Sequence, residues 1–143
     1  MSKKHATLSA SGAHGWLACT PSAKLEEGMP SVTSEYAEEG TVAHEVAELC
    51  ALYWTDQITE AEYENRLDTL KTNKWYTADM LSHCQEYAKM IRNKADGLRM
   101  KTGSVSVMIE TRVDFGPWVP DGFGTADCLI LAEGYMAVVD FKY

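Results

Sequence analysis

Apolar side chains recur every three to four positions through the first two-thirds of the chain, which is the spacing of amphipathic helices. The pattern predicts helices over residues 9–26, 34–54, 59–70 and 77–101. Their expected buried stripes are, in order, Trp16 and Leu17; Val42, Val46, Leu49 and Tyr53; Tyr63, Leu67 and Leu70; and Met80, Cys84, Tyr87, Ile91 and Leu98. Ser9 or Ser11 is the expected cap of the first helix. Thr59 opens a capping box, and Gly103 is the expected stop of the last helix.

The pattern changes at Ser104, where apolar and polar residues begin to alternate as they do in a strand. Strands are predicted over about 104–113, 124–132 and 135–142, and Glu133-Gly134 predicts a two-residue hairpin between the last two. That hairpin places residue 127 opposite residue 140. The predicted fold class is α/β in an α+β arrangement, with N-terminal helices packed on a small antiparallel β-meander.

Length and composition are those of one soluble domain over residues 1–143, with helices over about 9–101 and strands over about 104–142. No apolar run approaches the roughly 20 residues of a membrane span, and no secretory signal is visible, so we expect a cytoplasmic protein without a membrane partner. The four cysteines form no CxxC pair, which predicts reduced thiols, three of them in the core. The third strand reaches the last residue, which indicates a fragment of a longer protein.

The net charge of −8 and the pI of about 4.9 argue against a freestanding nucleic-acid binder, which would normally show a basic face. They do not exclude a nuclease, because a metal site concentrates carboxylates and a divalent cation supplies the missing positive charge. The acidic balance is also what favours a non-catalytic interaction module.

Three charged residues near the end of the chain suggest chemistry. Alternation along the third strand places Asp140 and Lys142 on one face, and the hairpin register brings Asp127 across from Asp140. Two carboxylates suit Mg²⁺ or Mn²⁺, and an ammonium stabilises charge that develops on a phosphate. The alternative is a buried Asp–Lys pair beside a solvated aspartate, which spacing alone favours. The apolar run that precedes Asp140 favours function, since charges are costly there.

Four segments resemble motifs of RecB-type PD-(D/E)XK nucleases, in the family order and over about residues 7–142. They are Ser9 to Cys19, Gly40-x-x-x-His44, Gly124-Thr125-Ala126-Asp127 and Val138-Val139-Asp140-Phe141-Lys142. The wording around them also looks like an uncharacterised family of phage and prophage proteins assigned to that superfamily.

The resemblance implies a restriction-endonuclease-like core, truncated at its C-terminus. Asp127, Asp140 and His44 would be ligands of Mg²⁺ or Mn²⁺, and Lys142 would be the catalytic lysine, with all four residues in the catalytic centre. Weaker candidates are Glu39, Glu48 and Glu110. Gly40 and Ala47 share a helix face with His44, so we expect their small side chains to let the sheet approach closely.

The implied activity is hydrolysis of DNA phosphodiester bonds, exonuclease-like, in phage replication or recombination inside a bacterial host. The partners would be DNA and other phage recombination or replication proteins. Some relatives hold an iron–sulfur cluster through an upstream cysteine that Cys19 matches and three cysteines near the C-terminus, so no cluster is expected in this fragment. We expect weak or no activity from the fragment, because Lys142 would be poorly held. Two alternatives remain: a non-catalytic interaction or assembly module with the same fold and, less favoured, a dinuclear phosphatase, for which further ligands are lacking.

Overall fold

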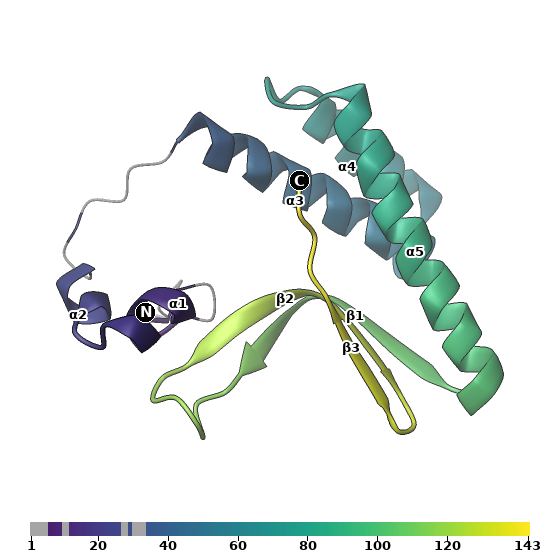
Figure 1. Ribbon diagram of the computed structural model, residues 1–143. Helices are drawn as coiled ribbons and strands as arrows, with labels where there is room; N and C mark the ends of the chain where they lie inside the picture. The colour runs from purple at the N-terminus through teal and green to yellow at the C-terminus, as the bar shows by residue number, and fades with distance from the viewer. Residues whose placement is uncertain (1–5, 10–11, 27–28, 30–33) are drawn as a thin grey trace. The chain divides into compact units, whose positions relative to one another are not determined.

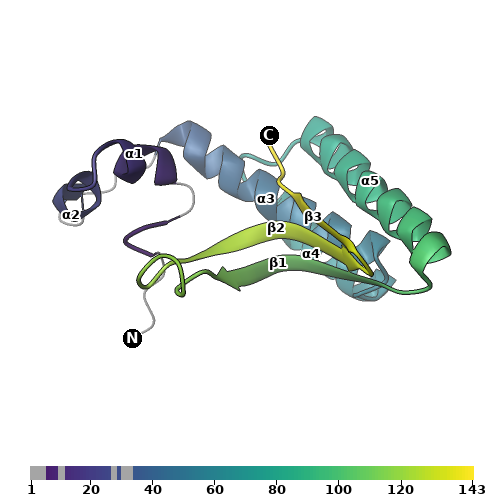
Figure 2. The same ribbon diagram turned by 60° about the horizontal axis from the view of Figure 1, so that its bottom comes forward.

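The computed structural model describes residues 6–9, 12–26, 29 and 34–143 (Figure 1). The elements in these residues are the helices α1 (Ala13–Ala18), α2 (Ser22–Glu26), α3 (Glu35–Trp54), α4 (Glu60–Lys71) and α5 (Ala78–Thr102) and the strands β1 (Val105–Asp114), β2 (Phe123–Ala132) and β3 (Tyr135–Val139). The strands form one sheet in the order β1-β2-β3 (Figure 2). The predicted α+β arrangement is therefore confirmed.

The chain divides into two compact units, each with its own internal contacts. The smaller unit comprises Met1–Val32 and Thr111–Ala126, and the larger unit comprises Thr33–Glu110 and Asp127–Tyr143. The larger unit contains α3, α4, α5, β3 and the adjoining halves of β1 and β2, and every residue discussed below as a candidate site belongs to it.

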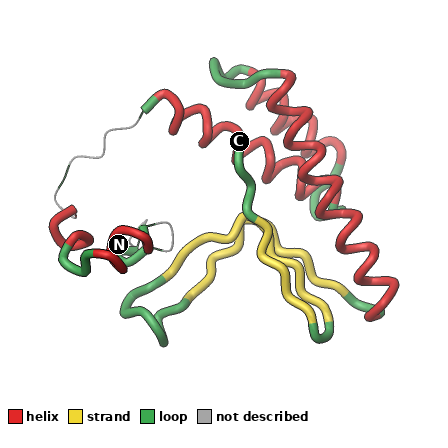
Figure 3. Tube along the Cα trace, viewed as in Figure 1, coloured by secondary structure: helices red, strands yellow, loops and turns green. Residues whose placement is uncertain are grey.

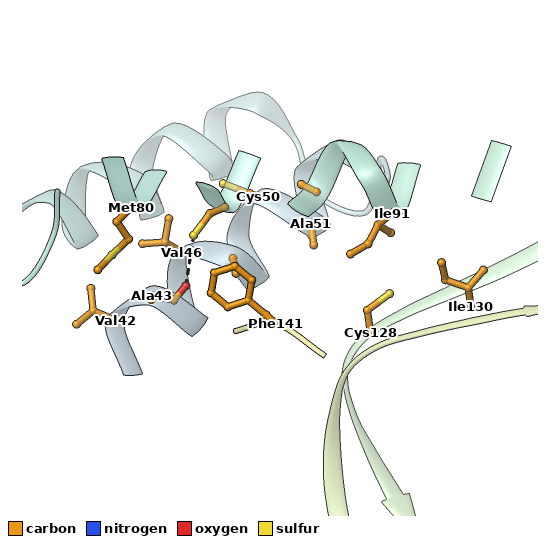
Figure 4. Packing of buried hydrophobic residues seen from close by; sticks show 13 residues of the cluster. Val42, Ala43, Val46, Cys50, Ala51, Met80, Ile91, Cys128, Ile130 and Phe141 are labelled. Carbon is orange, nitrogen blue, oxygen red and sulfur yellow. Dashed lines mark hydrogen bonds between the residues drawn. The ribbon is translucent and has the colours of Figure 1, made fainter. Parts of the chain in front are cut away.

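The core of the larger unit lies where α3 packs against α5 (Figure 4). Helix α5 buries one residue per turn, and these are Met80, Cys84, Ala88, Ile91 and Ala95. Three alanines and a cysteine are among the seven buried residues of α3, so short side chains make up much of the contact between the two helices. The sheet closes this core with Cys128 and Ile130, and Phe141 joins it from the segment after β3.

Local capping explains why the three long helices begin where they do. Side-chain oxygens of Ser34, Thr59 and Thr77 each accept a hydrogen bond from the backbone N–H three residues later, which satisfies one of the free donors of the first turn. Helix α5 ends at Gly103, whose φ of 80° is the left-handed conformation that glycine adopts at low cost. The predicted helices over 34–54, 59–70 and 77–101 are confirmed to within a residue or two.

The smaller unit departs from the predicted helix over residues 9–26, which forms as the two short helices α1 and α2. The break lies at Pro21, which has no N–H to continue a helix and disfavours helical backbone in the residue before it. The expectation that Leu17 faces inward is wrong, since it is 72% exposed. The N-cap of α1 is Gly12 without a side-chain cap bond, so Ser9 is not the cap that was expected, and Ser11 lies outside the described residues. The indole N–H of Trp16 donates to the carbonyl of Ser9 at 2.9 Å.

A tight turn joins β2 and β3 into an antiparallel hairpin (Figure 3). The pairing keeps the predicted register, from Cys128 opposite Val139 to Ala132 opposite Tyr135, but stops before the predicted pair of residues 127 and 140. Gly134 in the tight turn between them has a φ of 67°. The third strand is shorter than the predicted 135–142, because β3 ends at Val139 and the last residues form no strand. The prediction of three core cysteines is confirmed, with Cys19 the exposed one and all four thiols free.

Candidate metal centre

Three potential metal ligands from three different elements meet on the larger unit. His44 comes from α3, Glu110 from β1 and Asp127 from β2, and one ligand atom of each lies within 4.8 Å of the others. Donors bound to one small cation at about 2.0–2.3 Å lie roughly 3–4.6 Å apart, so small side-chain adjustments suffice for a shared ion. Two carboxylates and an imidazole suit a divalent cation such as Mn²⁺ or Mg²⁺.

Asp127 is the best-held member of this cluster. Its Oδ2 accepts the backbone N–H of Phe141 at 2.7 Å and lies 3.7 Å from Nδ1 of His44, and its side chain is only 15% exposed. The ring of Phe141 in turn meets the ring of His44 edge-on, with centroids 5.4 Å apart. Phe141, which is buried in the segment after β3, therefore contacts both Asp127 and His44 and restrains the positions of their side chains.

Glu110 joins the cluster through an unusual backbone conformation. Its φ is 47°, a left-handed value that is rare for any residue other than glycine and costs free energy inside a strand. Glu110 is an exposed residue, but partial desolvation of its carboxyl group, then the charge of Asp127 and that of Glu48, raise its pKa. Strand alternation placed Glu110 with Met108 and Arg112 and left it a weak candidate. The sequence carries no signal for a positive φ at a glutamate, so its place in the cluster emerges only in three dimensions.

Asp140 and Lys142 are placed differently from His44 and Asp127. Lys142 Nζ lies 2.7 Å from Asp140 Oδ2, and the two side chains are 81% and 59% exposed. The hydrogen bond and then the charge of Asp140 raise the pKa of Lys142, with a smaller contribution from Asp127. Because β3 ends before them, the strand face predicted to carry both does not form there, and Asp140 is not part of the three-ligand cluster.

The Asp140–Lys142 pair and the three-ligand cluster line two different cavities in the larger unit. Asp140 and Lys142 border a cavity of about 730 Å³ beside His83 of α5. His44, Glu110 and Asp127 border another of about 490 Å³, together with Ala37, Gly40, Thr41, Glu45 and Glu48 of α3. Of the weaker candidates, Glu48 lies beside the cluster and accepts from Arg66 at 3.3 Å, whereas Glu39 does not line this cavity.

Gly40 has a different role from the one its position suggested. A Cβ added there would meet nothing within 4 Å, so the expectation that Gly40 lets the sheet approach closely is wrong. Ala47, further along the same face, is buried and does pack tightly. The missing side chain at Gly40 instead leaves the cavity open one turn before His44.

Substituting Gly40→Ala is therefore expected to stabilise the protein by about 0.5–1 kcal/mol, because alanine loses less backbone entropy in a helix and the added methyl meets no neighbour. Urea unfolding followed by circular dichroism measures this change. Gly97→Ala in α5 is the matched control, since a Cβ there also meets nothing within 4 Å. A loss of stability in Gly40→Ala with the expected gain in Gly97→Ala would contradict the open space at Gly40.

Comparison with known protein families shows to which family the chain belongs. A model of the family described as "Protein of unknown function (DUF2800)" matches residues 5–143. The chain belongs to this family. No solved structure matches it. The family description names no activity, so the chemistry has to be argued from the cluster itself.

Membrane insertion through a helix finds no support in this structure. Within residues 6–9, 12–26, 29 and 34–143, no helix combines the length and the apolar character that a transmembrane span requires.

Proposed function

We propose that the protein is a metal-dependent nuclease that hydrolyses DNA phosphodiester bonds with Mg²⁺ or Mn²⁺. The observation that carries this proposal is the convergence of His44, Glu110 and Asp127, which lie far apart in the sequence, within 4.8 Å of one another. Two of them, His44 and Asp127, are the residues that the resemblance to RecB-type PD-(D/E)XK nucleases singled out. The same resemblance supports a restriction-endonuclease-like core and exonuclease-like work in phage or prophage replication or recombination, in the bacterial cytoplasm.

Each member of the cluster has a distinct task in this proposal. Asp127 and Glu110 supply the carboxylate oxygens that hold the cation, and His44 supplies a ring nitrogen. A bound divalent cation polarises the phosphoryl group and lowers the pKa of an attacking water. The hydrogen bond from Phe141 N–H holds Asp127 in place, which reduces the reorganisation needed on binding.

Lys142 is proposed as the residue that stabilises charge on the phosphate. Its raised pKa keeps it cationic at neutral pH, and it follows Phe141, whose backbone binds Asp127. Asp140 positions the ammonium group at 2.7 Å and is proposed as a further metal ligand once DNA draws Lys142 away. A bound divalent cation would add two positive charges to a chain whose net charge is −8 and would reduce the repulsion of DNA at the site.

The test is cleavage of labelled single- and double-stranded DNA by the protein in Mn²⁺ or Mg²⁺. Asp140→Ala is expected to reduce cleavage at least about 100-fold, as expected when a metal ligand or its support is lost. Asp68→Ala is the matched control, because Asp68 also pairs with a nearby lysine, Lys71 at 2.9 Å, on an exposed helix away from the cluster. Equal cleavage by the wild type and Asp140→Ala would contradict the proposal.

One observation favours the alternative of a non-catalytic interaction or assembly module. The Asp140–Lys142 pair satisfies itself outside the three-ligand cluster, as two residues of a surface ion pair would. A module of this kind would cleave no DNA in any divalent cation. Cleavage that requires Asp140 separates the two functions.

A further inference from the structure

A buried phenol on α5 faces the candidate metal centre and has no assigned task. The hydroxyl oxygen of Tyr87 is inaccessible to solvent, and among the described residues it has no hydrogen-bond partner. Its ring packs against Phe141, with centroids 5.0 Å apart, and so approaches the cluster from the side of α5. A buried hydroxyl without a partner is unfavourable, and such groups in native proteins are usually explained by function or by a bound group.

Tyr87 lies between the cluster and the cavity that Asp140 and Lys142 border, and it lines that cavity as well. Tyr87 lines a small void together with His44, Glu48, Glu110, Asp127 and Phe141. The void has no room for a water molecule, so water cannot satisfy the hydroxyl there. Burial and then the nearby charges, among them Asp127 and Glu110, raise the pKa of Tyr87, so the phenol keeps its proton and is available as a donor.

The two carboxylates near this donor differ in how well they are held. Asp127 already accepts from Phe141 N–H at 2.7 Å. Glu110 is exposed, and within the described part of the chain its carboxylate has no hydrogen bond from another protein group. Its backbone φ of 47° leaves it strained as well. Glu110 is therefore the carboxylate that still lacks support and the natural acceptor for Tyr87.

We propose that Tyr87 is a positioning residue of the metal centre, whose phenol O–H donates to the Glu110 carboxylate when a divalent cation binds. The hydrogen bond orients one carboxylate oxygen toward the cation and removes the uncompensated buried hydroxyl of the free protein. Such support from behind the ligands raises the affinity of a site for its metal. This inference rests on the proposed function, because it requires that His44, Glu110 and Asp127 hold a cation.

The test compares Mn²⁺ binding with stability in Tyr87→Phe. Phenylalanine keeps the ring contact with Phe141 and removes only the hydroxyl. Titration calorimetry with MnCl₂ is expected to show a Kd about 10-fold weaker than that of the wild type, in line with the loss of a group that orients a metal ligand. Thermal unfolding without metal is expected to give an equal or higher Tm, because the unpartnered hydroxyl is gone. A merely structural role would lower Tm and leave the Mn²⁺ affinity unchanged.

Tyr53→Phe is the matched control, because Tyr53 is also partly buried in the larger unit but stacks on Tyr63 with centroids 4.4 Å apart and does not line the void. It should bind Mn²⁺ like the wild type. Wild-type affinity in Tyr87→Phe overturns the inference and leaves the proposed function standing. Absence of Mn²⁺ binding by the wild-type protein overturns both.

Discussion

Replacing Asp127 by asparagine is expected to weaken Mn²⁺ binding at least about 100-fold and to abolish DNA cleavage, because the amide removes one of the two negative charges in the cluster. The amide oxygen can still accept the Phe141 N–H, so the fold around the site should survive. Titration calorimetry measures the affinity. Thermal unfolding gives a second readout, since a ligand at 100 times its Kd stabilises the native state by about 2.7 kcal/mol.

Mn²⁺ should therefore raise the Tm of the wild-type protein and leave that of Asp127→Asn almost unchanged. Asp114→Asn is the matched control, because Asp114 likewise accepts a backbone N–H, that of Gly116 at 2.8 Å, without belonging to the cluster. It should respond to Mn²⁺ as the wild type does. If Asp127→Asn binds Mn²⁺ normally, the cluster is not the metal site and the proposed nuclease loses its main support.

Replacing Ile91 by alanine is expected to destabilise the protein by about 3 kcal/mol, the largest effect on folding that we predict. Ile91 is fully buried on the face of α5 that packs against α3 and the sheet (Figure 4). The buried cluster to which Ile91 belongs consists largely of alanines and cysteines, whose short side chains cannot move far enough to fill a new cavity. Urea unfolding measures the loss.

Met90→Ala is the control for this substitution, because Met90 precedes Ile91 on the same helix and is 42% exposed. Its removal should change the free energy of unfolding by less than about 1 kcal/mol. Similar losses in the two variants would mean that the core is not centred on the packing of α3 against α5.

Local chemistry made much of the larger unit predictable. Thr59 and its capping box, Gly103 and the Glu133-Gly134 turn act through neighbours a few residues away, so their effects are visible in the sequence. The hairpin register followed from the turn and is confirmed. The prediction of one helix over residues 9–26 is wrong. The spacing of the apolar positions favours a helix there, but Pro21 interrupts it.

The candidate site was predictable only in part. The motif resemblance alone predicts His44, whereas the hairpin register and a motif predict Asp127. The structure brings the two together, with 3.7 Å between Nδ1 and Oδ2. The amino-acid sequence by itself determined the three long helices, the hairpin and the placement of Asp127 at its open end, because each depends on contacts between near neighbours.

Only the tertiary structure decided which groups share the cluster. Glu110 belongs to the cluster because its backbone has a positive φ. Tyr87 lies beside the cluster because α5 packs on Phe141. Asp140, which follows the end of β3, forms an ion pair with Lys142. The physical reason is the same in the three cases. Their positions depend on backbone conformation and on helix–sheet packing between segments distant in the chain, and neither property is encoded in local spacing.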